Sequence, residues 1–140
     1  MSRFVVDASA GAKWFLPEAG SQDAARLQDP AHELHVPAFF DVEIANIFWK
    51  TVRQGRLTRA EADVRVAQLL GLSLTRHPEG PLVAVAFDIA ERTGRTVYDC
   101  LYVALASDLG AVMVTADDRL VSAMAGTPWA AQLMRLADVP

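Results

Sequence analysis

The chain lacks most of the features that mark secreted, membrane-bound or generally nucleic-acid-binding proteins. It has a single cysteine, Cys100, so no disulfide can form within the chain, and such a composition is typical of a reducing compartment. The opening residues contain no apolar stretch of the kind found in secretory signals, and no later run approaches the ~18 apolar residues of a membrane span. The net charge is −4, and only two of the thirteen basic residues are lysine, which does not indicate broad affinity for nucleic acid. We therefore expect a cytoplasmic protein.

Several catalytic motifs are also missing. There is no Gly-x-Ser-x-Gly elbow for a nucleophilic serine, no Walker-type phosphate loop and no dinucleotide-binding glycine pattern. The three histidines, His32, His35 and His77, do not have the spacing of zinc ligands. Serine hydrolases, P-loop nucleotide hydrolases, Rossmann-type dehydrogenases and zinc enzymes are therefore disfavoured.

Short apolar segments alternate with longer helical patterns along the whole chain. With 140 residues, of which 52% are hydrophobic, the sequence predicts one domain over 1–140. Strands are predicted at residues 4–6, 34–36, 72–75, 111–115 and 132–136, and helices at 10–16, 22–28, 38–54, 59–70, 82–92, 96–107 and 119–124. This alternation predicts an α/β fold, a three-layer α/β/α sandwich around a central parallel sheet.

Several helix starts can be predicted from capping residues. Ser9 is the expected N-cap of the first helix, which Pro17 ends. Thr58 and Glu61 have the spacing of a capping box. Pro37 is expected at the start of the long third helix.

Two acids directly follow predicted strands. Asp7 ends the first strand, and Asp117, with Asp118 beside it, follows the strand that ends at Thr115. Each acid taken alone has a structural explanation, as a turn residue or a helix cap. In a parallel sheet, however, sites form where strands end and the chain turns into a helix, so Asp7 and Asp117 are expected at one edge of the fold.

A third acid, Glu43, lies on a helix that is apolar on almost every side. Glu43, Asn46 and Lys50 are three and four residues apart, so they share one face of this helix. Because a helix apolar nearly all round is mostly buried, this polar face must meet either solvent or a wet cleft.

The fourth acid, Asp99, lies in an apolar segment where an unpaired carboxylate would be costly. Thr96 as N-cap with Asp99 three residues later is one explanation, because it makes a capping box. A functional site is the other. If Asp99 converges with Asp7, Glu43 and Asp117, the mutual repulsion requires a cation or raised pKa values, and carboxylates alone select Mg²⁺ or Mn²⁺.

Four segments in this order resemble the PIN domain, and within it the VapC-type toxins of bacterial toxin–antitoxin pairs. They are VVDAS at 5–9, EIAN at 43–46, YDCLYVALA at 98–106 and VTAD at 114–117. The resemblance spans nearly the whole chain. It implies a parallel sheet in an α/β/α sandwich, a site of four acids that binds Mg²⁺ or Mn²⁺, endonucleolytic cleavage of RNA, a protein antitoxin and a toxin homodimer.

The resemblance also assigns roles to residues of this chain. The acidic site is carried over onto Asp7, Glu43, Asp99 and Asp117. Ser9 and Thr115 are the hydroxyls of the pattern, Asn46 is expected to support Glu43, and Asp118 is an additional acid with a supporting role. Lys13, Lys50 and Arg95 are candidates for contacts with RNA phosphates, with solvated surface charges as the alternative.

Other interpretations remain open from the sequence. Five basic residues within positions 50–65 either contact phosphate or form a solvated helix face with ion pairs. An antitoxin is expected to dock near the bulky apolar residues of the early helices, unless these form the core: Trp14, Phe15, Leu16, Phe39 and Phe40. The alternative function is a non-catalytic α/β regulatory module, although a receiver domain would need an acid pair after its first strand, and Asp-x-Asp phosphatases would need an acid where Ser9 stands.

Overall fold

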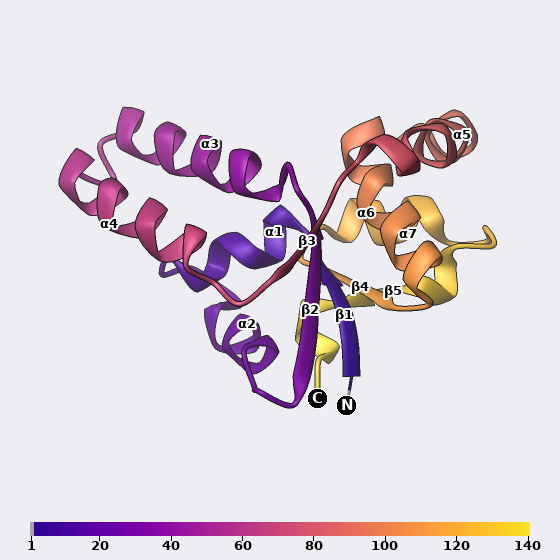
Figure 1. Ribbon diagram of the computed structural model, residues 1–140, viewed down its shortest axis with the longest axis horizontal. Coiled ribbons are helices and arrows are strands. Elements are labelled where there is room, and N and C mark those ends of the chain that lie inside the picture. Colours follow the sequence, from indigo (N-terminus) through magenta and orange to yellow (C-terminus); the bar gives the residue numbers. More distant parts are fainter. Residues whose placement is uncertain (1) are drawn as a thin grey trace.

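The structure, a computed structural model that describes residues 2–140, is built on a five-stranded parallel sheet (Figure 1). Its strands lie in the order β3-β2-β1-β4-β5. Their bounds are β1 (Ser2–Val6), β2 (His32–Pro37), β3 (Thr75–His77), β4 (Val112–Thr115) and β5 (Leu133–Arg135). The central strands are apolar because helices cover both faces of a parallel sheet.

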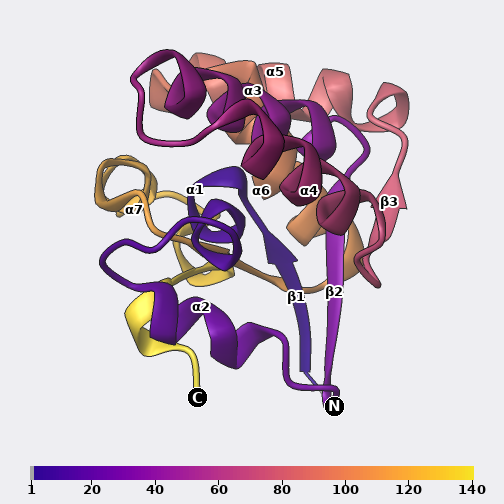
Figure 2. The same ribbon diagram turned by 90° about the vertical axis from the view of Figure 1, so that its left-hand side faces the viewer.

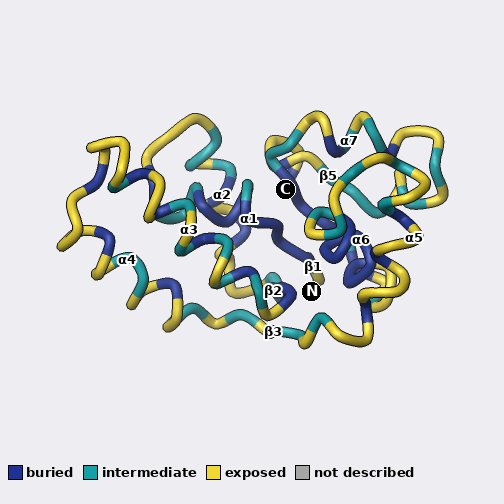
Figure 3. Tube along the Cα trace, turned by 90° about the horizontal axis from the view of Figure 1, so that it is seen from above, coloured by how far each residue is buried: buried dark blue, intermediate teal, exposed yellow. Residues whose placement is uncertain are grey.

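Within the described residues, seven α-helices cover the two faces of this sheet. They are α1 (Ala8–Gly11), α2 (Ser21–Leu27), α3 (Phe40–Arg53), α4 (Arg59–Leu70), α5 (Val83–Thr93), α6 (Val97–Leu109) and α7 (Asp118–Met124). The first four lie on one side of the sheet and the last three on the other (Figures 1 and 3). The three-layer α/β/α arrangement predicted from the sequence is therefore confirmed. Across residues 2–140, no helix combines the length and apolar character that crossing a membrane requires.

The connections diverge between β1 and β4, which are neighbours in the sheet. The chain leaves β1 toward α1 on one face and leaves β4 toward α7 on the other (Figure 1). Val6 pairs with Val114, so both strands end at the same level. Such a point, where the strand order reverses, is where open α/β sheets form their sites. Figure 2 shows the end of β1 beneath the helices, on the opposite side from the two chain termini.

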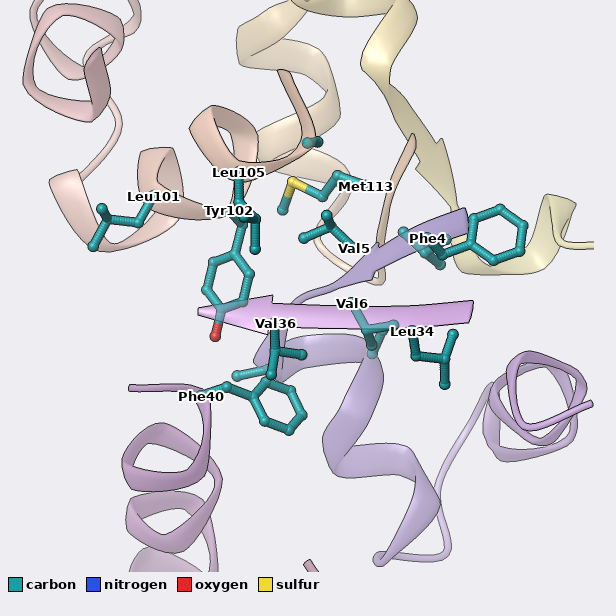
Figure 4. Packing of buried hydrophobic residues seen from close by; sticks show 14 of the residues in the cluster. Phe4, Val5, Val6, Leu34, Val36, Phe40, Leu101, Tyr102, Leu105 and Met113 are labelled. Carbon is teal, nitrogen blue, oxygen red and sulfur yellow. The ribbon is translucent and has the colours of Figure 1, made fainter. Parts of the chain in front are cut away.

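Helix α6 lies across the middle of the sheet and is the most buried helix of the fold. Every residue from 100 to 106 is buried. Leu105, Met113 and Val5 pack together in the layer between α6 and the strands (Figure 4). Cys100 is fully buried in this helix, and burial raises the pKa of its thiol. It is therefore a core residue, as a small apolar cysteine is expected to be.

Three predictions of local structure differ from the structure. Pro37, expected at the start of the third helix, is the last residue of β2, and α3 begins at Phe40. The helix predicted at 10–16 starts earlier, at Ala8, and gives way to a 3-10 turn over Ala12–Trp14. Its N-cap is Asp7, whose carboxylate accepts a hydrogen bond from the Ala10 amide, so the prediction of Ser9 as cap was wrong. The strand predicted at 72–75 lies at Thr75–His77, because the pairing of β2 with β3 begins only at Thr75.

The bulky apolar residues of the early helices contribute mainly to the core. Phe40 is fully buried and Leu16 is 6% exposed, so neither is available to a docking partner. Trp14 packs against Phe40, and its indole nitrogen donates a hydrogen bond to the Ala24 carbonyl. The interpretation of these residues as core, left open by the sequence, is therefore supported.

Candidate active site

Asp7 lies at the end of β1, surrounded by groups that donate hydrogen bonds to it. Its Oδ1 accepts from Ser9 Oγ at 2.7 Å and from the Ala10 amide at 3.0 Å. Its Oδ2 accepts from the Thr115 hydroxyl at the end of β4. The two hydroxyls are themselves 3.3 Å apart. The pairing of β1 with β4 therefore brings the predicted residues Asp7, Ser9 and Thr115 together.

The carboxyl group of Asp7 resists ionisation in this position. It is 6% exposed, and burial raises its pKa from 3.8 to about 6, despite the hydrogen bonds from Thr115 and Ser9. The charge of Asp99 adds to the increase. At neutral pH this side chain is thus an ionised group that favours a cation nearby.

Asp99 and Asp117 meet at a shared partner, Arg95. One guanidinium nitrogen, Nη2, donates to Asp99 Oδ2 at 3.3 Å and to Asp117 Oδ2 at 3.1 Å. Asp117 is also the N-cap of α7, because its Oδ1 accepts from the amides of Arg119 and Leu120. Thr96 caps α6 by accepting from the Asp99 amide, but the Asp99 carboxylate is paired with Arg95. Capping therefore does not account for the Asp99 side chain.

Glu43 faces the sheet from the first turn of α3. Its Oε1 accepts a hydrogen bond from the Tyr102 hydroxyl at 2.7 Å. Tyr102 is buried in α6, and Figure 4 shows its ring extending toward the start of α3. Burial raises the pKa of Glu43, and Asp7 and Asp99 raise it further. The polar face of α3 is thus divided, because Glu43 is partly buried against Tyr102 whereas Asn46 and Lys50 are exposed.

The four predicted acids affect one another electrostatically. Burial is the largest cause of the raised pKa of Asp99, and the charge of Asp117 contributes to it, while Arg95 acts in the opposite direction. The charge of Asp99 also raises the pKa of Asp7, and the charges of Asp7 and Asp99 raise the pKa of Glu43. Because such effects require proximity, the fold brings together acids that lie far apart in the chain.

Two residues assigned supporting roles lie elsewhere. Asn46 has an exposed side chain, and the partner of Glu43 is Tyr102. Asp118 has a side chain that is 80% exposed and lies 3.6 Å from Arg135. Tyr102 itself was not singled out from the sequence, although its position three residues after Asp99 places both on adjoining turns of α6.

The donor chemistry of this cluster fits a hard divalent cation. Carboxylate oxygens, with hydroxyls nearby, are ligands that Mg²⁺ and Mn²⁺ prefer. The side chains are nevertheless not arranged as a ready ligand set, since across residues 2–140 no group of three Asp, Glu, His or Cys side chains is positioned to hold one ion. Arg95 lies between two of the acids, and hydroxyls and an amide surround a third.

A groove with basic side chains adjoins the cluster. It has a volume of about 390 Å³, starts at Ser9 and Ala116, and runs between the 3-10 turn at Ala12–Trp14 and the second half of α3. Its basic lining residues are Lys13, Lys50 and Arg56. Lys13 is paired with Glu18, whereas no acid in the described part of the chain lies within ion-pair distance of Lys50.

The remaining basic residues of the 50–65 stretch have other contacts. Arg53 stacks over Trp49, Arg59 pairs with Asp63, and Arg65 donates to the Phe15 carbonyl. Arg53 and Arg59 therefore lie on the solvated surface and Arg65 is partly buried, while phosphate contact by Lys50 and Arg56 at the groove stays a prediction.

Comparisons with known proteins agree with this architecture. The PIN domain family matches residues 4–125. The chain is 38% identical to Ribonuclease VapC3 of Pyrobaculum aerophilum, over 84% of this chain and 92% of that protein. It is 34% identical to Ribonuclease VapC3 of Mycobacterium tuberculosis, over 85% of each. The crystal structure of PAE2754 from Pyrobaculum aerophilum superposes with a TM-score of 0.66 at 25% identity, covering 97% of this chain and 85% of that one. The chain therefore belongs to the PIN-domain family, and within it to the VapC group.

Proposed function

We propose that this protein is a divalent-metal-dependent endoribonuclease that acts as the toxin of a toxin–antitoxin pair. The observation that carries the proposal is the meeting of Asp7, Glu43, Asp99 and Asp117 beyond the ends of β1 and β4. Membership of the VapC group supports it, because the relatives over most of the chain are named as ribonucleases.

The residues of the cluster have distinct tasks in this proposal. Asp7, Glu43, Asp99 and Asp117 would hold Mg²⁺ or Mn²⁺, which supplies a water of lowered pKa and neutralises charge on the phosphate. Thr115 and Ser9 orient the Asp7 carboxylate through the hydrogen bonds described above. Tyr102 fixes the rotamer of Glu43 by donating to one oxygen and leaves the other oxygen free of that bond.

The basic groove gives the RNA a path to these acids. Phosphate contacts position a nucleic acid without selecting its sequence, and lysine and arginine make most of them. Lys50 and Arg56 are exposed and line the groove that begins at Ser9. Because the net charge is negative, this local basic lining must provide the attraction that the whole chain does not.

Two protein partners belong to the proposal. Membership of the VapC group supports a cognate antitoxin that binds and inhibits the enzyme. A homodimer is supported by large apolar side chains that are exposed on four helices of the described chain, a composition that favours an interface. They are Val42 and Trp49 on α3, Val64 and Leu70 on α4, Val83, Val85 and Phe87 on α5, and Tyr98 on α6.

The non-catalytic regulatory module is the alternative, and one observation favours it. Asp7 and Asp117 both cap helices, so they have structural tasks besides any catalysis. Capping alone does not require Glu43 and Asp99 to share the same region, however. A cleavage assay distinguishes the two functions.

Metal removal tests the proposal directly. We expect the purified protein to cleave single-stranded RNA in Mg²⁺ or Mn²⁺, and to lose this activity completely in excess EDTA. Readdition of the metal should restore cleavage. The metal should also raise the melting temperature, because it binds only the folded cluster. Cleavage that persists in EDTA would contradict the proposed mechanism, and an inactive protein in every metal would favour the regulatory module.

Glu43→Gln tests whether this acid belongs to the metal site. The amide still accepts the Tyr102 hydroxyl but removes a charge that Asp7 and Asp99 oppose. We expect metal-free stability at pH 8 to stay equal or to rise by up to about 1 kcal/mol, while metal-induced stabilisation and cleavage both fall. Glu91→Gln on the exposed face of α5 is the control. Wild-type behaviour of Glu43→Gln in both assays would place Glu43 outside the site.

Lys50→Ala tests the groove. We expect it to weaken binding of single-stranded RNA by roughly two- to fivefold and to reduce the salt dependence of binding. Binding is measured by fluorescence anisotropy in EDTA, so that no cleavage occurs. Arg59→Ala removes the same charge from the exposed face of α4, where Arg59 pairs with Asp63, and should bind RNA as the wild type does. Equal binding by both variants would show that RNA does not follow this groove.

A further inference from the structure

Arg95 is the one basic residue of the described chain whose side chain forms an ion pair with the acid cluster. It lies between Gly94, which ends α5 in the left-handed conformation, and Thr96, the N-cap of α6. Its backbone amide donates to the Thr93 hydroxyl at 3.3 Å. This short connection between two helices fixes the backbone of Arg95 and directs its side chain toward Asp99 and Asp117.

The guanidinium group is held only by those two carboxylates. Nη2 makes both contacts, at 3.3 Å and 3.1 Å, and Nε is buried without a hydrogen-bond partner. An arginine anchored for structural reasons normally uses more of its five N–H donors. The two contacts also join separate parts of the fold, because Asp99 lies in the first turn of α6 and Asp117 follows β4.

A divalent cation held by Asp99 and Asp117 would compete with Arg95 for their carboxylates. Asp99 Oδ2 and Asp117 Oδ2 both accept from Nη2. The positive charge of the guanidinium and its place between the two carboxylates therefore both oppose a cation at this point.

We propose that Arg95 is an internal counter-ion that competes with the metal for Asp99 and Asp117. In the metal-free protein it offsets the repulsion between the two carboxylates and keeps the cluster closed. It must move aside before the cation binds, so it lowers the apparent metal affinity. This inference rests on the proposed metal-dependent function, and it assigns Arg95 a positioning role that differs from the phosphate contact expected from the sequence.

The expected effect of removing Arg95 is a gain in metal binding. A phosphate-binding or purely structural arginine would leave metal affinity unchanged or reduce it. Because Arg95 is about a quarter exposed, its contacts are partly screened, and we expect Mg²⁺ to bind Arg95→Ala roughly fivefold more tightly. The metal-free melting temperature should fall at the same time, because the repulsion is no longer offset.

The experiment is a Mg²⁺ titration followed by calorimetry and by thermal unfolding, with no RNA present. It compares wild type, Arg95→Ala and Arg95→Gln. Arg95→Gln keeps more of the side chain without its charge, and it replaces the alanine variant in the comparison if that variant does not fold. Arg92→Ala is the matched control, because Arg92 pairs with Asp88 on the exposed face of α5 and is three residues from Arg95. The proposal expects tighter Mg²⁺ binding and a larger metal-induced rise in melting temperature in the Arg95 variants alone.

Two other outcomes would contradict either the competition by Arg95 or the proposed metal dependence. If wild type binds Mg²⁺ and the Arg95 variants bind it equally or more weakly, competition by Arg95 is wrong and the proposed function stands. If none of the proteins binds Mg²⁺ or Mn²⁺, both the proposed metal dependence and the competition are wrong.

Discussion

Asp7→Asn is expected to reduce RNA cleavage by at least ~100-fold and to make the metal-free protein more stable than the wild type above pH 6. The loss of activity follows from replacing a charged ligand with a neutral amide of the same shape. The gain in stability follows from burial, which raises the pKa of Asp7 from 3.8 to about 6. This one substitution is therefore expected to reduce RNA cleavage while it increases the stability of the metal-free protein.

The direction of the pH effect can be stated in advance. A carboxyl group with a raised pKa in the folded state favours folding most below its unfolded pKa, and this contribution is lost as the pH rises through about 6. At roughly 1.4 kcal/mol per pKa unit, ionised Asp7 costs the metal-free protein about 3 kcal/mol at pH 8. The Asp7→Asn variant avoids most of this cost, because the amide oxygen can still accept from the Ala10 amide.

Urea unfolding in EDTA at pH 5 and pH 8 measures this effect. Wild type should lose stability between the two values, and Asp7→Asn should lose much less. In Asp7→Asn, the raised pKa values of Glu43 and Asp99 should still make the free energy of unfolding fall as the pH rises, but less than in wild type. Full cleavage activity in Asp7→Asn would show that Asp7 is not part of the site. If the stability of wild type and of Asp7→Asn changed equally with pH, the charge of the Asp7 carboxylate would not be destabilised by burial.

Phe40→Ala is expected to lower the free energy of unfolding by about 3–5 kcal/mol. Phe40 is fully buried at the start of α3. It packs on Gly11 so closely that a Cβ at that position would lie 2.6 Å from Phe40 Cζ. The ring therefore sets the separation of α1 from α3, and these two helices follow Asp7 and carry Glu43, respectively.

Phe87→Ala is the matched control, because the same side chain is 60% exposed on α5. It should change stability by no more than about 0.5 kcal/mol. Chemical denaturation of both variants gives the comparison. A loss of less than about 1 kcal/mol in Phe40→Ala would show that the space around Gly11 closes up when the ring is removed.

The sequence was sufficient to predict the sandwich, because the alternation of short apolar strands and helices depends on patterns along the chain. The same patterns placed Asp7 and Asp117 at one edge, since both follow apolar strands and strand ends in a parallel sheet meet there. Glu43 was singled out from the apolar surroundings on its own helix. The assignment of all four acids to one metal site came from the resemblance to the PIN domain, and it stays a prediction.

The partners of the acids could not be predicted in this way. Asn46 shares a helix face with Glu43, yet the hydroxyl that reaches Glu43 comes from Tyr102, 59 residues later. Arg95 was a candidate for a phosphate contact by position, and its guanidinium lies between two acids. Such contacts depend on the angle at which α3 and α6 cross the sheet, which no local pattern specifies. The three-residue edge strand β3 was misplaced for a related reason, since pairing with β2 determines where it starts.

The buried Cys100 provides a way to time the opening of this protein. It is the only thiol in the sequence and is fully covered within α6. A thiol reagent can therefore modify the native protein only during excursions that uncover α6 from its neighbours, which include Thr93 of α5 beside the thiol. Because Asp99 and Tyr102 belong to the same helix, an excursion that moves α6 away from the sheet also separates them from Asp7 and Glu43. The labelling rate of one cysteine thus sets an upper limit on how often the site opens in this way.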